Sequence, residues 1–310
     1  MTRPGRRRSF GQRSGVLLLI PGIAYLVLFF LVPVGFIAYY SLGYKPALFG
    51  TVATDRLSLD RYKEALGPTF LATFTNTLQI AVIGTLSCLV IGLPVAYWAA
   101  RHLGPRSRHV VLALILLPFW TNFLIRTVGW VVVLAPGGWL SHLLQAAHLT
   151  SHPLDVLDTR GAVQLGVVYN YVVYMILPIY VAFERTDPAL REAARDLGAT
   201  RWRAFRQVTL PQAAAGIAAG LILVFIPLCG DYITATILGG AKGNMVGQLV
   251  AGQFLGTQNW ALGSAVAMLL VVSVLVVTAL LAALAYGTLA LLRRRRRVVL
   301  VTPTVAVAHA

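Results

Sequence analysis

The chain has 310 residues, of which 58% are hydrophobic and only 12% are charged, and its mean hydropathy is +0.76. A soluble domain carries about a quarter charged residues, so this composition excludes an ordinary soluble protein and predicts one membrane-embedded bundle. The formal net charge of +16 could indicate a nucleic-acid partner, but the basic residues lie in short clusters between apolar runs. That is the pattern of membrane topology.

Long apolar runs recur along the chain. Among the stretches that contain no Asp, Glu, Lys or Arg are 14–44, 65–100, 161–183, 207–230 and 243–292. A helix needs about 20 apolar residues to cross the hydrocarbon core, and only helices or closed barrels pair their backbone groups inside lipid. Because the runs lack the alternation of barrel strands, we predict an all-α integral membrane protein. Its six transmembrane helices are expected near 16–42, 72–100, 109–133, 161–183, 213–238 and 261–292.

The basic residues predict the orientation of these helices. Nineteen Lys and Arg lie on one predicted face and seven on the other, and the basic excess marks the cytoplasmic side. Both termini are therefore expected in the cytoplasm. The first apolar run is longer than the roughly 7–15 residues of a signal-peptide core, so we expect an uncleaved anchor. The predicted divisions are a basic cytoplasmic N-terminus (1–15), a six-helix transmembrane domain (16–292) and a basic cytoplasmic tail (293–310).

The predicted outer loops are modest. Segment 43–71 mixes acidic and basic residues and indicates a solvated loop with one short helix. Segment 137–149 predicts a helix in the outer interface, because one helical face would carry Trp139, Leu140, Leu143, Leu144 and Ala147.

The longest predicted cytoplasmic connection, 184–212, contains the signals of two short helices. Asp187 can cap a helix that starts at Pro188, where a missing amide hydrogen costs nothing. Gly198 can end that helix in a left-handed conformation, and Thr200 can cap the second helix.

Two aromatic residues of this connection, Trp202 and Phe205, have no apolar span to join. A soluble partner with a groove would cover them, and the alternating arginines and carboxylates would set its register. The alternative is that they anchor the loop at the membrane interface. Docking of a helix–turn–helix on duplex DNA is excluded, because the connection has a net charge of only +2 and is tethered under lipid.

The same connection contains a motif of fixed spacing: Glu-Ala-Ala, three residues, Gly, nine residues, Val-x-Leu-Pro. It resembles the cytoplasmic signature of ABC importers of the binding-protein-dependent class, in which Ile usually stands at the position of Val208. In that family this loop forms the coupling helix, which fits a cleft on a separate ATP-hydrolysing subunit. The residues that the resemblance assigns to this docking element and to the start of the fifth crossing are Glu192, Ala193, Ala194, Gly198, Leu210 and Pro211.

The resemblance also implies partners. The sequence has no G-x-x-x-x-G-K-[ST] phosphate-binding loop, so we expect a non-catalytic permease subunit with no cofactor of its own, whose ATP is bound by separate ATPase subunits. A second permease subunit, expected to be a sister chain, and an extracytoplasmic solute-binding protein complete the expected complex in the bacterial cytoplasmic (inner) membrane. A secondary transporter, the less favoured alternative, would usually show inverted repeats, and the sequence shows none.

Three segments narrow the resemblance to the spermidine/putrescine branch of these permeases. They are LIRTVGW (124–130), DPALREAARDLGA (187–199) and FIPLCGDYITATILGG (225–240). The resemblance implies import of polyamines. Ferric ion, thiamine and phosphonates, which relatives in that branch also carry, stay open as alternative solutes.

Asp231 is the only acidic residue within a predicted crossing. Pro227 and Gly230 before it can open the helix locally. An intramembrane carboxylate usually faces a bundle interior or a water cavity, where it would stabilise a polyamine cation, and Tyr232 could add a cation–π contact. The alternative is that Asp231 lies hydrated at the outer end of its helix.

The fourth predicted crossing supplies further candidates for the substrate pathway. Tyr169 and Tyr174, with Asn170 and Tyr171 between them, could line a cavity, although aromatic residues at this depth also serve as packing. Arg126, near the outer end of the third crossing, is expected to extend to the outer surface.

Overall fold

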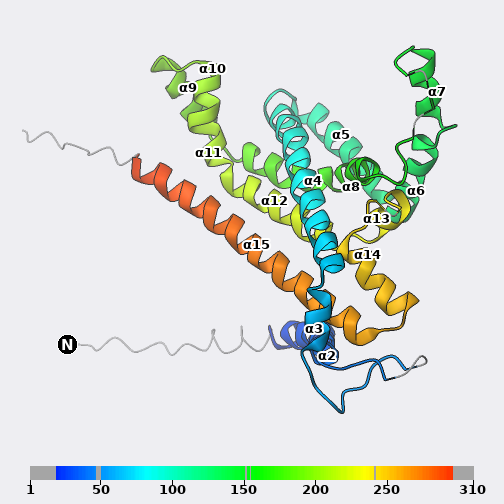
Figure 1. Ribbon diagram of the computed structural model, residues 1–310. Helices are drawn as coiled ribbons and strands as arrows, with labels where there is room; N and C mark the ends of the chain where they lie inside the picture. The colour runs from blue at the N-terminus through cyan, green and yellow to red at the C-terminus, as the bar shows by residue number, and fades with distance from the viewer. Residues whose placement is uncertain (1–18, 47–49, 151, 154, 241, 296–310) are drawn as a thin grey trace, which may run out of the picture.

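The described part of the chain folds into helices (Figure 1). The computed structural model describes residues 19–46, 50–150, 152–153, 155–240 and 242–295. Within these ranges the extended pairing is limited to one isolated bridge, between Tyr44 and Ala53, so the predicted all-α class is confirmed. The predicted N-terminal segment 1–15 lies outside the described residues, as does the predicted tail 293–310 beyond residue 295.

Several helices are long and apolar enough to cross a membrane. The described ranges contain five of them: Leu19–Tyr40, Pro68–Arg101, Phe123–Ala146, Arg160–Glu184 and Trp260–Leu280. A further apolar unit is bent by 65° and consists of Arg201–Gln212 and Ala214–Cys229. The fold therefore offers five spans, or six if the bent pair is one span.

Three helices pack together at the centre of the bundle: α4 (Pro68–Arg101), α8 (Arg160–Glu184) and α12 (Ala214–Cys229). α4 begins at a proline, which suits the first turn of a helix. α8 begins after Thr159, whose hydroxyl accepts a hydrogen bond from the Ala162 amide at 3.3 Å. The largest fully buried side chains of this centre include Met175, Ile179, Phe183, Phe225 and Leu228.

Close contact between α8 and α12 depends on two glycines. At Gly216 a Cβ atom would lie 2.5 Å from the carbonyl oxygen of Pro178, and at Gly220 it would lie 2.8 Å from the sulfur of Met175. Because neither position carries a side chain, the backbone of α12 rests directly on α8, as small residues allow between membrane helices.

The predicted third crossing, 109–133, is wrong as a single helix. The chain forms α5 (Pro105–Leu116), a 3₁₀ turn (Leu117–Trp120) and then α6 (Phe123–Leu134). Pro118 lies in the turn, and a proline there removes an amide donor and disfavours continuation of the preceding helix.

The chain restarts as a helix at Asn122, whose side chain accepts a hydrogen bond from the Leu124 amide at 2.8 Å. After α6, α7 (Trp139–Ala146) follows. The predicted helix within 137–149 is therefore confirmed, whereas its place in a membrane interface stays a prediction.

The predicted fifth crossing, 213–238, is also interrupted. α12 ends at Cys229, and α13 (Ile233–Leu238) begins after a break at 230–232. The expectation that Pro227 and Gly230 open the helix here is confirmed, since Gly230 is the residue at which α12 stops.

The last span is α15 (Trp260–Arg295), one continuous helix where 261–292 was predicted. α14 (Val246–Ala251) and α3 (Asp60–Ala65) pack near its start. α3 is the short helix expected within 43–71.

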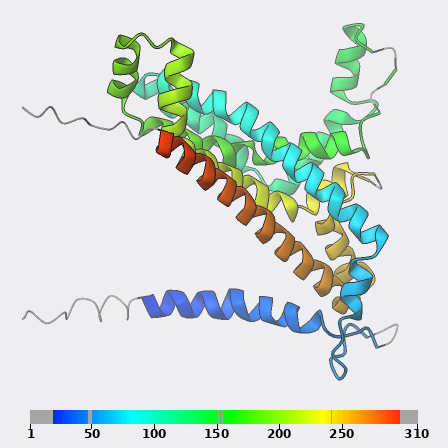
Figure 2. The same ribbon diagram turned by 60° about the vertical axis from the view of Figure 1, so that its left-hand side comes forward.

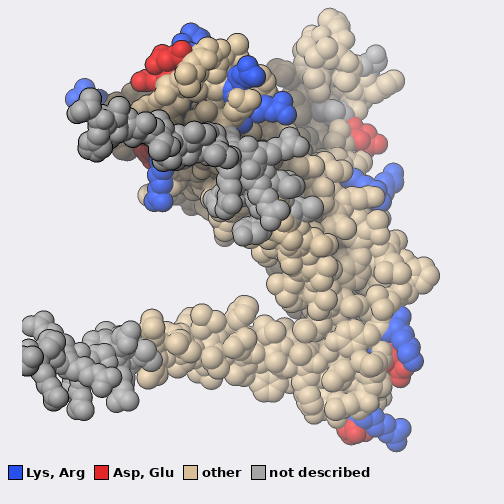
Figure 3. Space-filling view, turned by 90° about the vertical axis from the view of Figure 1, so that its left-hand side faces the viewer, with Lys and Arg blue, Asp and Glu red and all other residues tan. Residues whose placement is uncertain are grey.

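The first described helix, Leu19–Tyr40, projects away from the bundle (Figure 2). Its last part, α2 (Val32–Tyr40), makes the contact with the bundle, where the ring centroids of Tyr40 and Trp260 lie 6.5 Å apart. None of the side chains of Leu19–Tyr40 is buried. A wide hollow separates this helix from the bundle in the space-filling view (Figure 3).

Charged side chains gather at two ends of the molecule (Figure 3). One group lies over α9 (Pro188–Asp196) and α10 (Arg201–Ala204), and the other lies around α3. Further acidic and basic side chains lie on the right-hand side of the same view (Figure 3). The start of the first described helix and the end of α15 both lie on the side of α9 and α10 (Figures 1 and 2).

Candidate functional site

The motif-bearing connection forms α9 and α10, which we call the coupling segment (188–204). Asp187 Oδ1 accepts a hydrogen bond from the Ala189 amide at 2.9 Å, and Pro188 is the first helical residue. Thr200 Oγ1 accepts from the Arg203 amide at 3.3 Å at the start of α10. Both predicted caps are confirmed.

Gly198 turns the chain between the two helices. Its φ is +85°, in the left-handed region that favours glycine. Its amide donates to the Arg195 carbonyl at 2.9 Å, and the Ala199 amide donates to the Ala194 carbonyl at 3.0 Å. This pair of bonds satisfies the last carbonyls of α9, so the predicted stop at Gly198 is confirmed.

One of the two aromatic residues assigned to a partner belongs instead to this chain's own core. The ring centroid of Phe205 lies 5.0 Å from that of Tyr97 on α4 and 6.3 Å from that of Phe183 on α8. The prediction of a partner contact for Phe205 is therefore wrong. Trp202 stacks on Phe205 at 5.6 Å but stays 69% exposed, so it alone of the pair faces outward.

The outer face of the coupling segment is open. Leu197 is 89% exposed, and Leu190 is 52% exposed. Glu192 and Ala193 are exposed beside them, and Ala194 is half-buried. An open hollow of about 610 Å³ is lined by Glu192, Arg195, Asp196, Gly198, Ala199, Thr200 and Arg201. Apolar side chains flanked by charge on a rigid two-helix element are suited to a protein partner.

The two remaining motif residues connect the coupling segment to the bundle. Leu210 and Pro211 begin α11 (Leu210–Gln212), after a π-helical turn at Phe205–Thr209. Both are half-buried. They lead into α12 through the 65° bend, so the coupling segment is joined through α11 to the helix that ends two residues before Asp231.

Asp231 lies in the break between α12 and α13 and is only 6% exposed. The expectation that it is hydrated at a helix end is therefore wrong. Its Oδ1 accepts from the Thr234 amide at 3.0 Å, and its Oδ2 accepts from the Thr234 hydroxyl at 2.6 Å. The carboxylate thus holds the first turn of α13 in place.

A buried polar network surrounds this carboxylate. Asn170 on α8 donates to the Thr127 hydroxyl at 3.2 Å and to the Thr234 hydroxyl at 3.4 Å. Tyr171, the next residue on α8, interacts electrostatically with Asp231. Side chains of α6, α8 and α13 therefore meet at one point inside the bundle.

Aromatic rings extend the network toward the surface. The ring of Tyr174 lies 4.7 Å from that of Phe119 and 6.0 Å from that of Tyr171. The Arg126 guanidinium lies 5.2 Å from the centroid of Phe119 and 5.6 Å from that of Phe123. Arg126 is half-buried over these rings, and its extension to the outer membrane surface stays a prediction.

The predicted pathway residues are only partly brought together. Asp231 and Tyr174 both contact Tyr171, whereas Tyr169 packs on Trp130 at 5.3 Å, in a separate contact. Tyr232 is 46% exposed. Thr234 is not among the predicted pathway residues, although its place three residues after Asp231 is a capping signal. No sequence signal could have identified Thr127, whose partner lies on another helix.

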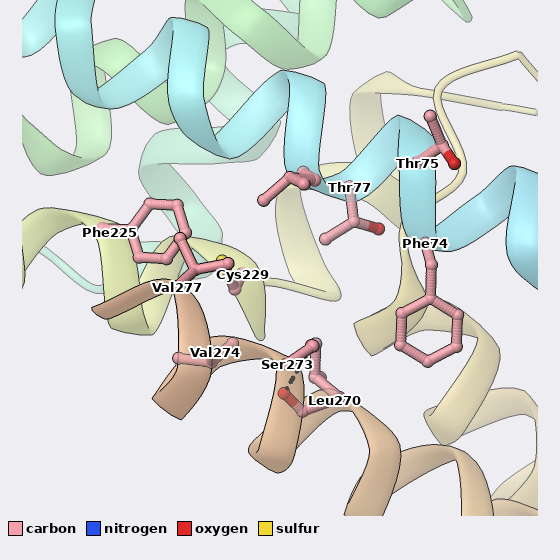
Figure 4. A pocket seen from close by; sticks show the side chains of 10 residues that line it. Phe74, Thr75, Thr77, Phe225, Cys229, Leu270, Ser273, Val274 and Val277 are labelled. Atoms are coloured by element: carbon pink, nitrogen blue, oxygen red, sulfur yellow. Dashed lines mark hydrogen bonds between the residues drawn. The ribbon is translucent and has the colours of Figure 1, made fainter. Parts of the chain in front are cut away.

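A cavity of about 190 Å³ lies between α4, α12 and α15 (Figure 4). Its wall is mostly apolar and includes Phe74, Phe225, Cys229, Val274 and Val277. The three hydroxyls that line it all donate to carbonyl oxygens of their own helices at 2.8–2.9 Å, namely those of Thr75, Thr77 and Ser273. No predicted pathway residue lines this cavity, and its wall suits an apolar occupant better than a cation.

Comparison with known proteins agrees with this architecture. Residues 92–298 match the family described as the binding-protein-dependent transport system inner membrane component. The spermidine/putrescine transport system permease protein PotB of Haemophilus influenzae is 39% identical over 239 residues, which cover 77% of this chain and 82% of that protein. PotB of Escherichia coli is 36% identical over 215 residues, which cover 69% of this chain and 78% of that protein.

Solved structures share the fold. A chain of a bacterial ABC transporter involved in the import of the acidic polysaccharide alginate superposes with a TM-score of 0.69 and 18% identity, covering 89% of this chain and 96% of that chain. The alginate transporter in complex with an alginate-bound periplasmic protein gives a TM-score of 0.71 and 17% identity, with 87% and 93% covered. This chain therefore belongs to the family of inner-membrane components of binding-protein-dependent transport systems.

Proposed function

We propose that this chain is a permease subunit of an ATP-binding-cassette importer for the polyamines spermidine and putrescine. The observation that carries the proposal is the coupling segment: a two-helix element fixed by two caps and a left-handed glycine, with Leu190, Leu197 and Trp202 exposed. Such a surface needs a partner that covers it. The family that this chain belongs to, and the PotB relatives, support the assignment.

The proposed topology has six crossings and both termini in the cytoplasm. The bent pair ending in α12 counts as one crossing. In this topology α5 with α6 takes the place of Phe123–Ala146 as the third crossing, and α7 lies outside it. The basic excess supports this orientation, as does the placement of α9 and α10 on the side where the first described helix begins and α15 ends.

The proposed division of labour places ATP on another polypeptide. An ATPase subunit would take the exposed face of the coupling segment, and ATP hydrolysis there would move α11 and α12. This chain is then a non-catalytic subunit with no cofactor of its own. An extracytoplasmic binding protein would deliver the solute, and a second permease subunit would complete the pathway.

The proposed solute follows from the relatives and from the buried carboxylate. Spermidine and putrescine appear in the names of the PotB proteins. A polyamine carries two or more positive charges, and Asp231 with the rings of Tyr171 and Tyr174 offers an anion and π-faces for them.

Reconstitution tests the proposal. The chain would be placed in proteoliposomes with an ATPase subunit, a second permease subunit and a polyamine-loaded binding protein. We expect ATP-dependent accumulation of labelled spermidine. Association with the ATPase but uptake of a different solute would contradict the polyamine assignment alone. If no ATPase subunit binds the chain, the importer assignment itself is wrong.

A further inference from the structure

A second hollow beside the coupling segment is lined mainly by cations. Its volume is about 220 Å³, and its basic lining consists of Arg101, His102, Arg191, Arg195 and Arg201. These side chains come from three elements: the end of α4, α9 and α10. Tyr97 and Ala204 form the rest of the wall, so no carboxylate lines the hollow. We call it the arginine pocket.

The four arginines of this pocket have no acidic partner among the described residues. The ion pair recorded at this end of the molecule joins Arg108 to Glu184 at 2.9 Å. Arg101 donates to the Thr186 carbonyl at 2.8 Å, but its Nε is buried without a hydrogen-bond partner.

None of the nearby carboxylates of the described residues forms an ion pair with an arginine of the pocket. Asp187 caps α9, and Glu184 is paired with Arg108. Glu192 and Asp196 line the other hollow of the coupling segment, together with Arg195 and Arg201, but do not line the arginine pocket. The lining of the arginine pocket itself therefore carries positive charge without a carboxylate.

Positive charge of this density favours an anion. Arg191 and Arg108 both repel Arg101 electrostatically, and repulsion between like charges grows where protein replaces water. Guanidinium groups present paired donors that match a phosphate. On the proposed topology the pocket lies at the cytoplasmic membrane surface, where anionic headgroups concentrate.

We propose that the arginine pocket binds a phosphate group, from an anionic phospholipid headgroup or from soluble phosphate, and so ties the coupling segment to the end of α4. The bound group would bridge α4 to α9 and α10, next to the contact between the ring of Tyr97 on α4 and that of Phe205, the residue that follows α10. The orientation toward the cytoplasm rests on the proposed function, whereas the binding is tested on the purified chain alone.

The test is thermal unfolding of the full chain in an uncharged detergent. One arm adds phosphatidylglycerol, with phosphatidylcholine as its reference. The other arm adds inorganic phosphate, with chloride at equal ionic strength as its reference. We expect phosphatidylglycerol, inorganic phosphate or both to raise the Tm by a few degrees, as ligands of a folded state do. If both probes raise the Tm, soluble phosphate is sufficient to fill the pocket. If only phosphatidylglycerol raises the Tm, the bound group is a lipid headgroup.

Two double variants separate the pocket from general surface charge. Arg191→Gln with Arg195→Gln removes two pocket cations and should weaken the apparent affinity roughly tenfold or more. Arg203→Gln with Arg206→Gln removes the same charge from exposed positions of the same connection that do not line the pocket, and should keep the shift. Arg101 is left intact, because it also holds Thr186.

Three results would overturn the proposal. The wild-type chain could show no shift with either probe. Both double variants could lose the shift equally, which would indicate non-specific attraction. The pocket variant could bind both probes normally while losing association with the ATPase subunit, in which case the arginines serve acidic side chains of that subunit.

Discussion

At the scale of single residues, the left-handed backbone conformation at position 198 most clearly favours one residue type, glycine. No atom lies within 4 Å of where its Cβ would be, so a substitution there tests backbone conformation alone. A left-handed conformation costs an L-residue about 1–2 kcal/mol, most for a β-branched one, and least for Asn. We expect Gly198→Val to lower transport roughly 5–30-fold and Gly198→Asn to lower it much less.

The measurement is uptake in proteoliposomes, with membrane insertion followed by membrane fractionation. Gly104→Val is the matched control, because Gly104 is an exposed cap at the same end with an ordinary φ of −68°. Equal uptake by the Val and Asn variants of Gly198 would show that its conformation plays no part in coupling.

A substitution at Asp231 tests whether the solute is a polyamine cation. Asp231→Asn keeps an acceptor oxygen for the Thr234 amide but removes the charge. If the carboxylate meets the polyamine, we expect the apparent affinity for spermidine to fall roughly tenfold or more. Thr127→Val is the control, because it removes a hydroxyl of the same network and leaves the carboxylate unchanged. Uptake kinetics that are unaltered in the Asn variant would remove Asp231 from the pathway.

At the scale of elements, the coupling segment divides into a face for a partner and a face for its own bundle. Trp202 is 69% exposed, whereas Phe205 packs between Tyr97 and Phe183. We expect Trp202→Ala to weaken association with the ATPase subunit by about 2 kcal/mol, the size of an interface hot spot, with an unchanged Tm.

Phe205→Ala should do the reverse. It should lower the stability of the chain, by less than the roughly 3–5 kcal/mol of a fully buried Phe, because Phe205 is half-buried. Pull-down affinity measures the loss of ATPase binding in both variants, and thermal unfolding measures their loss of stability. If Trp202→Ala lowers the Tm as much as Phe205→Ala, the two rings form one internal stack and the assigned partner face is wrong.

Local signals in the sequence predicted elements well where one residue decides the outcome. Asp187, Gly198 and Thr200 each act through bonds to neighbours within a few residues. Pro118 is the local signal for the break at 117–122, but the ends of the two helices could not be predicted, because apolar composition is the same in a membrane helix and in a turn between two. The side on which Phe205 packs was missed as well, because its contacts lie on other helices. Tyr97 on α4 is 108 residues earlier in the chain, and Phe183 on α8 is 22 residues earlier.

The polar network around Asp231 shows that contacts between helices could not be predicted for the site either. Asp231 and Tyr171 could be suspected individually, as polar groups in apolar runs. Their meeting with Thr127 and Asn170 depends on how α6, α8 and α13 pack, and no single-sequence pattern contains that information.

At the scale of the whole molecule, the first helix is the element that the rest of this chain leaves uncovered. Leu19–Tyr40 has exposed apolar side chains around its whole circumference, including Ile23, Leu26 and Phe29. It contacts the bundle only near Tyr40, and a wide hollow lies beside it (Figure 3). A second permease subunit seated in that hollow would cover the helix and the facing surface of the bundle together.

We therefore expect the first helix to lie against the second permease subunit in the assembled transporter. A photo-reactive phenylalanine at Phe29, which is 63% exposed, should give a permease–permease adduct upon irradiation. The same group at Leu57, which is 56% exposed near the charged end around α3, serves as the control for non-specific capture.

The native Cys88 and Cys229 are both buried, so a cysteine pair at Phe29 and Leu275 can report independently on whether the helix folds back onto its own α15. Adducts at Phe29 with lipid alone, or an efficient disulfide within one chain, would contradict this placement, because either result would mean that the helix is covered without a second permease subunit.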